Sequence, residues 1–196
     1  MILLSKIRKI YKNYLANKRI QKLKETKATD FERWSKDNVF HENWNERTQL
    51  LSNFILPDAA IIEFGAGSQV LKTMVTDCKK YVPSDIVKRN EETLVCDLNQ
   101  PLVLDLSAFD TVVFSGVLEY VFDVDLVFQY LQQNQISQVV LSYCTTDLVA
   151  SNRKLYGWLS DYSEGDLLEI FKANQYTIVA TKQWKNQKLF DLRLAE

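Results

Sequence analysis

Two glycines and a pair of acids carry the clearest chemical signal in this sequence. Gly65 and Gly67 stand one residue apart in IIEFGAGSQV (residues 61–70), directly after an apolar run. Glycines at such a turn let backbone N–H groups approach a ligand closely. Asp85 follows the glycines at about 20 residues, the spacing at which an acid can accept both hydroxyls of a ribose. Asp97 follows the next apolar run, where it can accept a hydrogen bond from an adenine amine.

These residues can act together only if a sheet brings them to one edge. Short apolar runs that alternate with helical patterns predict an α/β sheet with both faces covered. The strands are expected at 60–64, 80–83, 93–96, 111–114, 138–143, 176–181 and 188–194, and helices at 70–76, 126–133 and 163–173, with an aromatic-rich helical segment before them at 30–55. The last two strands have no helix between them and predict a hairpin. In open α/β sheets, ligands bind beyond the carboxyl ends of the strands, where the glycines and acids stand.

On these residues the chain resembles the class I S-adenosylmethionine-dependent methyltransferases. EFGAG (63–67) stands where that family has its glycine-rich first motif, VPSD (82–85) matches its ribose-binding acid, and VCDL (95–98) its adenine-side acid. FDTVVFSGVLEY (109–120) is close to the family's fourth-strand motif. The resemblance covers residues 42–194. More narrowly, IEFGAG, PSDIV, CDLNQ and FSGVLEY resemble a bacterial subgroup found among polysaccharide-biosynthesis functions.

The resemblance implies a Rossmann-like fold with a seven-stranded, mostly parallel sheet, an antiparallel C-terminal hairpin strand and helices on both faces. It implies a methyltransferase with S-adenosyl-L-methionine as cofactor. The residues expected to bind the cofactor are Glu63, Gly65, Ala66, Gly67, Asp85, Ile86, Asp97, Leu98 and Ser115. Glu63 would hold the ammonium group of the cofactor, or would instead orient the glycine loop as a strand-end acid.

Departures from the family pattern limit which cofactor and which methyl acceptor are expected. Gln69 stands where many members have a third glycine, and a dinucleotide fingerprint would need glycine at Val70, so a nicotinamide-dependent oxidoreductase ranks low. In members that methylate amines or bases, a motif after the fourth strand receives the planar nitrogen of the acceptor; here FSGV (114–117) stands in its place. The aspartates of the metal-dependent members are also absent. A hydroxyl of a saccharide or small molecule is therefore the leading acceptor, with no metal expected.

Methyl transfer is an in-line displacement, so positioning supplies much of the rate, and a hydroxyl acceptor also calls for a general base. The candidate catalytic residues are His41, Glu119, Tyr120 and Asp147, and the candidate substrate-binding residues are Tyr120, Trp158 and Tyr162. Each has a plainer interpretation. The histidine and acids suit exposed or helix-start positions, and the aromatics suit core or rim packing. Trp34 and Trp44 carry the same ambiguity.

The N-terminal 30 residues are strongly basic, unlike the rest of the chain. The formal net charge is −1, yet residues 1–30 hold nine bases and two acids. Apolar residues recur there at three- and four-residue spacing, which predicts a basic amphipathic helix over 1–27. We expect residues 1–30 to form a helical extension and 31–196 the methyltransferase domain. The helix would pack on its own domain or on a second subunit, or contact a membrane surface or another protein.

Composition sets the remaining expectations. Cys78, Cys96 and Cys144 are far apart and odd in number, which favours a reducing cytoplasm. No run of about 18 apolar residues predicts a membrane span, and the near-zero net charge gives no reason to expect nucleic-acid binding. The alternative to an enzyme is a non-catalytic methyltransferase-like module that acts through its basic helix.

Overall fold

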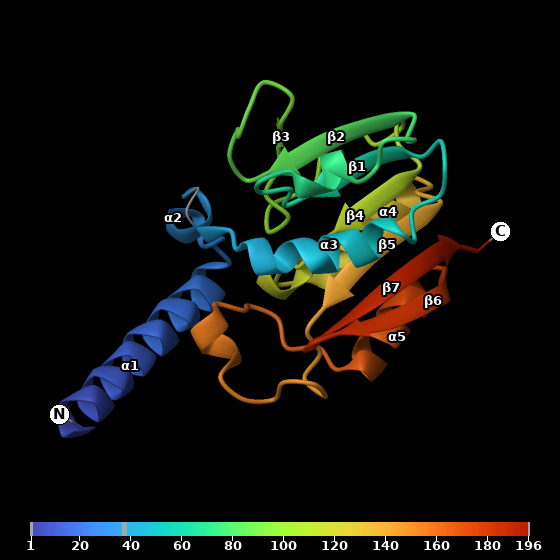
Figure 1. The fold of residues 1–196 in the computed structure, drawn as a ribbon. Helices are drawn as coiled ribbons and strands as arrows, with labels where there is room; N and C mark the ends of the chain where they lie inside the picture. The colour runs from blue at the N-terminus through green and yellow to red at the C-terminus, as the bar shows by residue number, and fades with distance from the viewer. Residues whose placement is uncertain (1, 37–38, 196) are drawn as a thin grey trace.

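One sheet positions every candidate site residue. The computed structural model describes residues 2–36 and 39–195, and there seven strands form a sheet in the order β3-β2-β1-β4-β5-β7-β6 (Figure 1). The strands are β1 (Ala60–Phe64), β2 (Lys80–Asp85), β3 (Leu94–Val95), β4 (Thr111–Phe114), β5 (Gln138–Tyr143), β6 (Tyr176–Trp184) and β7 (Gln187–Leu194). Strands β1 to β5 are parallel, and β7 is antiparallel to β5 and β6. The predicted mostly parallel sheet with a C-terminal hairpin is confirmed.

The strand order reverses between β1 and β4. From β1 the chain builds β2 and β3 on one side, then returns to build β4 and β5 on the other. Such a switch point opens a crevice beyond the carboxyl ends of the two central strands.

Helices cover both faces of the sheet, as predicted. On one face, Phe64 and Phe114 pack with α4 (Val124–Gln133) and α5 (Glu164–Ala173). On the other face, Ile61 and Val113 pack with α3 (Asn45–Ser52) and the 3-10 helix η3 (Val70–Thr73). Figure 1 shows α3 crossing in front of β4 and β5. Neighbouring strand residues face opposite layers because side chains alternate along a strand.

The start of α5 was predicted correctly. Ser163 accepts a hydrogen bond from the backbone N–H of Asp166, whose carboxylate accepts in return from the N–H of Ser163. This reciprocal capping box satisfies two N–H groups that the helix itself leaves without a partner.

The helical predictions for two other segments were wrong in detail. Residues 70–76 form only η3, because Val70, Thr73, Val75 and Thr76 are β-branched and lower helix propensity. Residues 30–55 do not form one helix. They divide into α2 (Phe31–Trp34), the 3-10 helix η2 (Glu42–Trp44) and α3, and α2 is capped by Asp30, which accepts from the N–H of Arg33.

Helix α1 (Ile2–Thr26) confirms the predicted first helix and projects from the body (Figure 1). Its C-terminal half is attached to the body. Ile20 is 2% exposed, Lys24 Nζ lies 3.2 Å from Asp161 Oδ2, and the helix packs against the 3-10 helix η5 (Arg153–Tyr156). None of the helices in the described residues is long and apolar enough to cross a membrane.

Candidate active site

A cavity of about 440 Å³ opens at the switch point, beyond the carboxyl ends of the central strands. All nine residues predicted to bind the cofactor line it: Glu63, Gly65, Ala66, Gly67, Asp85, Ile86, Asp97, Leu98 and Ser115. Four of the predicted catalytic or substrate residues line it too: His41, Glu119, Tyr120 and Trp158. The topology thus brings together residues as far apart in sequence as His41 and Trp158.

The glycine loop after β1 depends on both glycines. Gly65 and Gly67 have φ angles of 64° and 50°, in the left-handed region that side chains disfavour. A Cβ on Gly65 would lie 2.6 Å from Val117 Cγ2, and one on Gly67 would lie 2.6 Å from Phe40 Cε1. The loop therefore needs glycine for its backbone conformation and for its close packing.

Asp85 holds this loop in place. Its Oδ2 accepts a hydrogen bond of 2.9 Å from the N–H of Gly67, and Arg89 Nε lies 3.5 Å from the same oxygen. The guanidinium of Arg89 also lies 5.1 Å from the centre of the Phe40 ring. Among the described residues, Asp85 Oδ1 has only a long contact, 3.4 Å from the N–H of Val87, which leaves that oxygen able to accept from a ligand.

Asp97 lies in the turn after β3 and is tied to the segment after α1. Its Oδ1 accepts from Thr29 Oγ1 at 2.6 Å and from the N–H of Asn99 at 3.0 Å. Asn99 in turn donates to the carbonyl of Tyr120 at 2.9 Å, which links this turn to the one after β4.

Glu63 is a buried acid at the inner end of the cavity. It is 3% exposed and accepts a hydrogen bond from the hydroxyl of Tyr81. Burial raises the pKa of Glu63 to about 8, because a carboxylate out of water loses its hydration. A cationic group beside it would favour the ionised form again.

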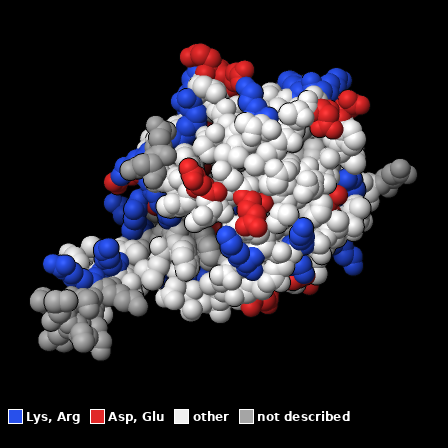
Figure 2. All heavy atoms as spheres, in the orientation of Figure 1, with Lys and Arg blue, Asp and Glu red and all other residues white. Residues whose placement is uncertain are grey.

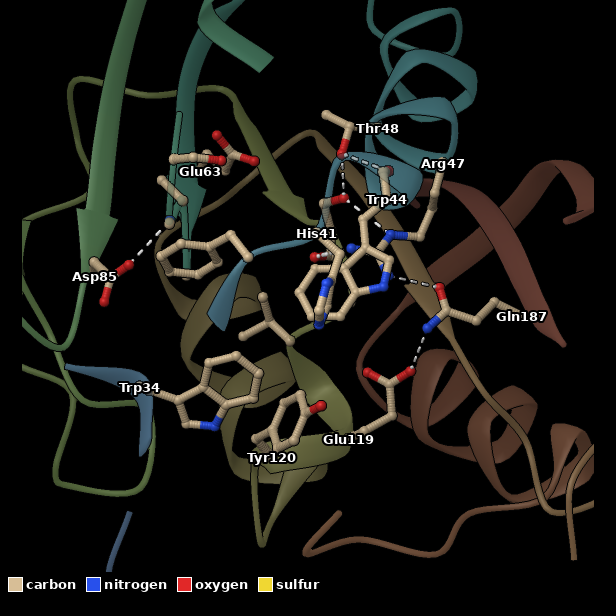
Figure 3. A pocket seen from close by; sticks show the side chains of 18 of the residues that line it. Trp34, His41, Trp44, Arg47, Thr48, Glu63, Asp85, Glu119, Tyr120 and Gln187 are labelled. Atoms are coloured by element: carbon tan, nitrogen blue, oxygen red, sulfur yellow. Dashed lines mark hydrogen bonds between the residues drawn. The ribbon is translucent and has the colours of Figure 1, made fainter. Parts of the chain in front are cut away.

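A hydrogen-bond network occupies the opposite end of the cavity (Figure 3). Gln187 Nε2 donates to Glu119 Oε1 at 3.1 Å, and its Oε1 accepts from Arg47 Nη1 at 3.1 Å. Arg47 also donates to the carbonyl of Ser115 at 2.9 Å, while the Ser115 and Thr48 hydroxyls lie 2.8 Å apart. Helix α3, the turn after β4 and the start of β7 are thereby joined at this end.

Glu119 has one carboxylate oxygen available. The side chain is 1% exposed, and Oε1 accepts from the N–H of Cys144 at 2.9 Å as well as from Gln187. Oε2 has no hydrogen-bond partner among the described residues. Burial raises the pKa of Glu119, so this oxygen takes up a proton more readily than an exposed carboxylate would.

Aromatic side chains form much of the cavity wall. All four tryptophans of the chain line it: Trp34, Trp44, Trp158 and Trp184. The Tyr120 ring meets the Trp34 ring edge-on at 4.6 Å, and burial raises the pKa of Tyr120 to about 12, so its hydroxyl stays protonated at neutral pH. His41 is exposed at the rim, 5.0 Å from the Trp44 ring.

Asp147 and Tyr162, two other predicted site residues, do not line the cavity. Asp147 instead accepts a hydrogen bond of 2.6 Å from the N–H of Glu164, the first residue of α5. Tyr162 packs against the hydrophobic core, 6.2 Å from the Tyr143 ring. The loop after β5 turns toward α5, so the carboxyl-end position of Asp147 does not bring it to the cavity.

The structure adds site residues that the sequence did not single out: Arg33, Arg47, Thr48, Trp184 and Gln187. The two hairpin residues reach the cavity because antiparallel β7 starts at the edge where β5 ends. Arg47 lies in a helix of ordinary polar composition, and only its burial, at 6% exposed, distinguishes it. No local pattern marks these positions.

No protein-family model and no curated protein matches the chain by sequence. Solved structures do match it. An S-adenosylmethionine-dependent methyltransferase of Mesorhizobium loti has a TM-score of 0.60 at 14% identity, over 74% of this chain and 95% of that one. The chain has the class I methyltransferase fold.

Two further structures share this methyltransferase fold. A Haloferax volcanii protein solved in complex with the Trm112 methyltransferase activator has a TM-score of 0.68 at 11% identity, over 85% of this chain and 96% of that one. The 1,6-didemethyltoxoflavin-N1-methyltransferase of Burkholderia thailandensis was solved with S-adenosylhomocysteine bound. It has a TM-score of 0.58 at 14% identity, over 79% of each chain.

Within this methyltransferase fold, the segment after the glycine loop is unlike the one that binds a dinucleotide cofactor. A pyrophosphate is seated against the first turn of an α-helix in dinucleotide-binding folds. Here the glycine loop leads into the four-residue 3-10 helix η3, whose preceding residue, Gln69, has a φ angle of 58°.

Proposed function

We propose that this protein is an S-adenosylmethionine-dependent methyltransferase that methylates a hydroxyl group of a saccharide or small molecule. The observation that carries the proposal is the convergence of the glycine loop, Glu63, Asp85 and Asp97 on one cavity, in a chain with the methyltransferase fold. The free cysteines Cys78, Cys96 and Cys144 suit a reducing cytoplasm as the compartment.

The cavity residues fit the chemical groups of the cofactor. Asp85 would accept from the ribose hydroxyls through its open Oδ1, and Asp97 would accept from the adenine amine. Glu63 would hold the ammonium group, because a buried carboxylate gains most from a cationic partner. The backbone of Gly65, Ala66 and Gly67 lets the ligand approach without a clash.

The other end of the cavity suits an acceptor that gives up a proton. The bound cofactor supplies an electrophilic methyl group, and this chain must position the acceptor and remove its proton. Glu119 Oε2 is buried, lacks a hydrogen-bond partner among the described residues and belongs to a carboxyl of raised pKa, which suits a general base. Trp158 and Trp184 line the cavity and would give the acceptor apolar surface.

Titration calorimetry with S-adenosylhomocysteine tests the proposal. The wild-type protein should bind it, and Asp85→Ala should weaken binding by about 100-fold, because a charged acceptor of two hydrogen bonds is lost. Asp105→Ala is the matched control, since Asp105 is an exposed acid outside the cavity, and it should bind as the wild type does. Circular dichroism verifies that each variant is folded.

Absence of binding by folded wild-type protein would overturn the cofactor assignment, and equal binding by Asp85→Ala would overturn the ribose assignment. The acceptor class needs a second measurement. Release of S-adenosylhomocysteine is followed with saccharides, phenols and amines as acceptors. Turnover with amines alone would contradict hydroxyl methylation.

A further inference from the structure

Helix α1 exposes an apolar stripe that its own domain does not cover. Ile7, Ile10, Tyr11, Tyr14 and Leu15 are 46–69% exposed. Their three- and four-residue spacing places them on one face of the helix, over an arc of about 140° at 3.6 residues per turn. A stripe of this width normally faces a protein core.

The face that attaches α1 to the body is the opposite one. Ile20 is 2% exposed, and Ala16 and Leu23, on the same side, are half-buried. Nine residues separate Tyr11 from Ile20, which is about two and a half turns, so the two side chains point in opposite directions. The stripe is therefore not the part of α1 that packs on its own domain.

Positive charge surrounds the stripe. The first 24 residues contain eight bases and no acid. Arg8 and Lys12 stand beside the stripe, and Lys18 and Lys22 continue its line toward the body; all four are exposed. Figure 2 shows basic side chains on the projecting part of α1.

We propose that this face of α1 binds the surface of an anionic lipid bilayer. Such binding combines burial of apolar side chains at the headgroup boundary with attraction of Lys and Arg to anionic lipids, and neither alone gives a stable attachment. Tyr11 and Tyr14 suit the interface, because their rings are apolar and their hydroxyls remain in water. A second copy of the chain fits less well, since two facing stripes would bring Arg8, Lys12, Lys18 and Lys22 of both copies together.

Membrane binding through α1 would also place the cavity near the lipid. The helix packs on η5, whose Tyr156 lines the cavity, and Arg33 Nη1 donates to the carbonyl of Tyr156 at 2.6 Å.

Vesicle flotation tests this inference with the full chain. Wild-type protein should float with phosphatidylcholine vesicles that contain phosphatidylglycerol, should not float with pure phosphatidylcholine, and should be released by high salt. Ile10→Asn with Tyr14→Asn should lower the partition coefficient by about tenfold or more, through lost apolar burial. Arg8→Gln with Lys12→Gln should lower it by about fivefold per charge removed.

Val103→Asn is the matched control, because Val103 is an apolar residue 90% exposed on a loop of the body, and it should float like the wild type. The inference is overturned if the wild type does not float, or if it floats equally with neutral vesicles. It is also overturned if the stripe residues mediate a concentration-dependent dimer in light scattering. Binding of S-adenosylhomocysteine should be the same in all these variants, so this test and the test of the proposed function are independent.

Discussion

Two buried carboxylates, Glu63 and Glu119, lie at opposite ends of one cavity. Both have a raised pKa because burial penalises the charged form. Their neighbours differ, since Glu63 accepts from a tyrosine hydroxyl, whereas one carboxylate oxygen of Glu119 has no partner in the part of the chain that the structure describes. We assign the first to holding a cation and the second to accepting a proton.

The raised pKa of Glu63 makes stability depend on pH. The carboxyl titrates at about 8 in the folded chain and at 4.5 ordinarily, so between these values the folded state binds more protons than the unfolded state. Stability must then fall as pH rises through this window, by at most about 5 kcal/mol. Glu63→Gln, which cannot ionise, should show a smaller fall in the free energy of unfolding, measured with urea, between about pH 5 and about pH 9, and Glu119 accounts for part of the fall that remains.

The control for this prediction is Glu91→Gln, since the Glu91 side chain is 94% exposed and should leave the pH dependence as it is. A wild-type protein whose stability is flat from pH 5 to 8 at constant salt would contradict the assignment to Glu63.

Glu119→Gln separates catalysis from binding. Glutamine keeps the Oε1 acceptor for the N–H of Cys144 and for Gln187 but removes the basic oxygen. With an acceptor identified as above, kcat should fall by about 100-fold or more. The affinity for S-adenosylhomocysteine should stay within about twofold of the wild type, because the lost base acts on the acceptor. Unchanged kcat would remove Glu119 from the reaction.

At the scale of elements, the turn after β4 connects the sheet to α3. Gly116 has a φ angle of 68°, and a Cβ there would lie 2.3 Å from Arg47 Nη1. Arg47 cannot easily withdraw, because it is buried and donates to both Ser115 and Gln187. Burial also lowers the pKa of Arg47, and the acid Glu119 opposes that shift.

Gly116→Ala should therefore lower the free energy of unfolding by about 2–4 kcal/mol, from backbone strain and displacement of the guanidinium. Gly165→Ala is the contrasting variant. Gly165 lies in the first turn of α5, where an added Cβ would lie 3.7 Å from Ser163 Oγ, an ordinary van der Waals contact. Gly165→Ala should raise the free energy of unfolding by about 0.5–1 kcal/mol. Urea titrations that give the same change for Gly116→Ala and Gly165→Ala would refute the role of Gly116 in this turn.

The sequence predicted the elements better than it predicted the Glu119 end of the cavity. Strand ends are local features, so apolar runs and spacing were enough to predict that Glu63, Asp85 and Asp97 would lie together. The network of Arg47 and Gln187 could not, because it joins residues 68 to 140 positions apart through the hairpin. Asp147 is the converse case: its strand end was predicted correctly, but the loop that follows turns toward α5 and away from the cavity.

At the scale of the whole molecule, α1 is attached by one face of its C-terminal half. Ile20→Asp should detach it, because a buried charge without a partner is costly. Limited trypsin digestion should then cut the basic residues of α1 about tenfold faster, while the rest of the chain stays protected. Tyr14→Asp, on the opposite exposed face, should digest like the wild type. Equal digestion of both variants would show that Ile20 does not hold the helix.

The tryptophans around the cavity give the molecule a built-in optical reporter. Since all four lie on its wall, the tryptophan fluorescence of the chain comes from this one place. A molecule that enters the cavity displaces water from indole rings and alters their emission. Ligands can therefore be screened on the unlabelled protein, and an unchanged spectrum would indicate that a compound does not reach the site.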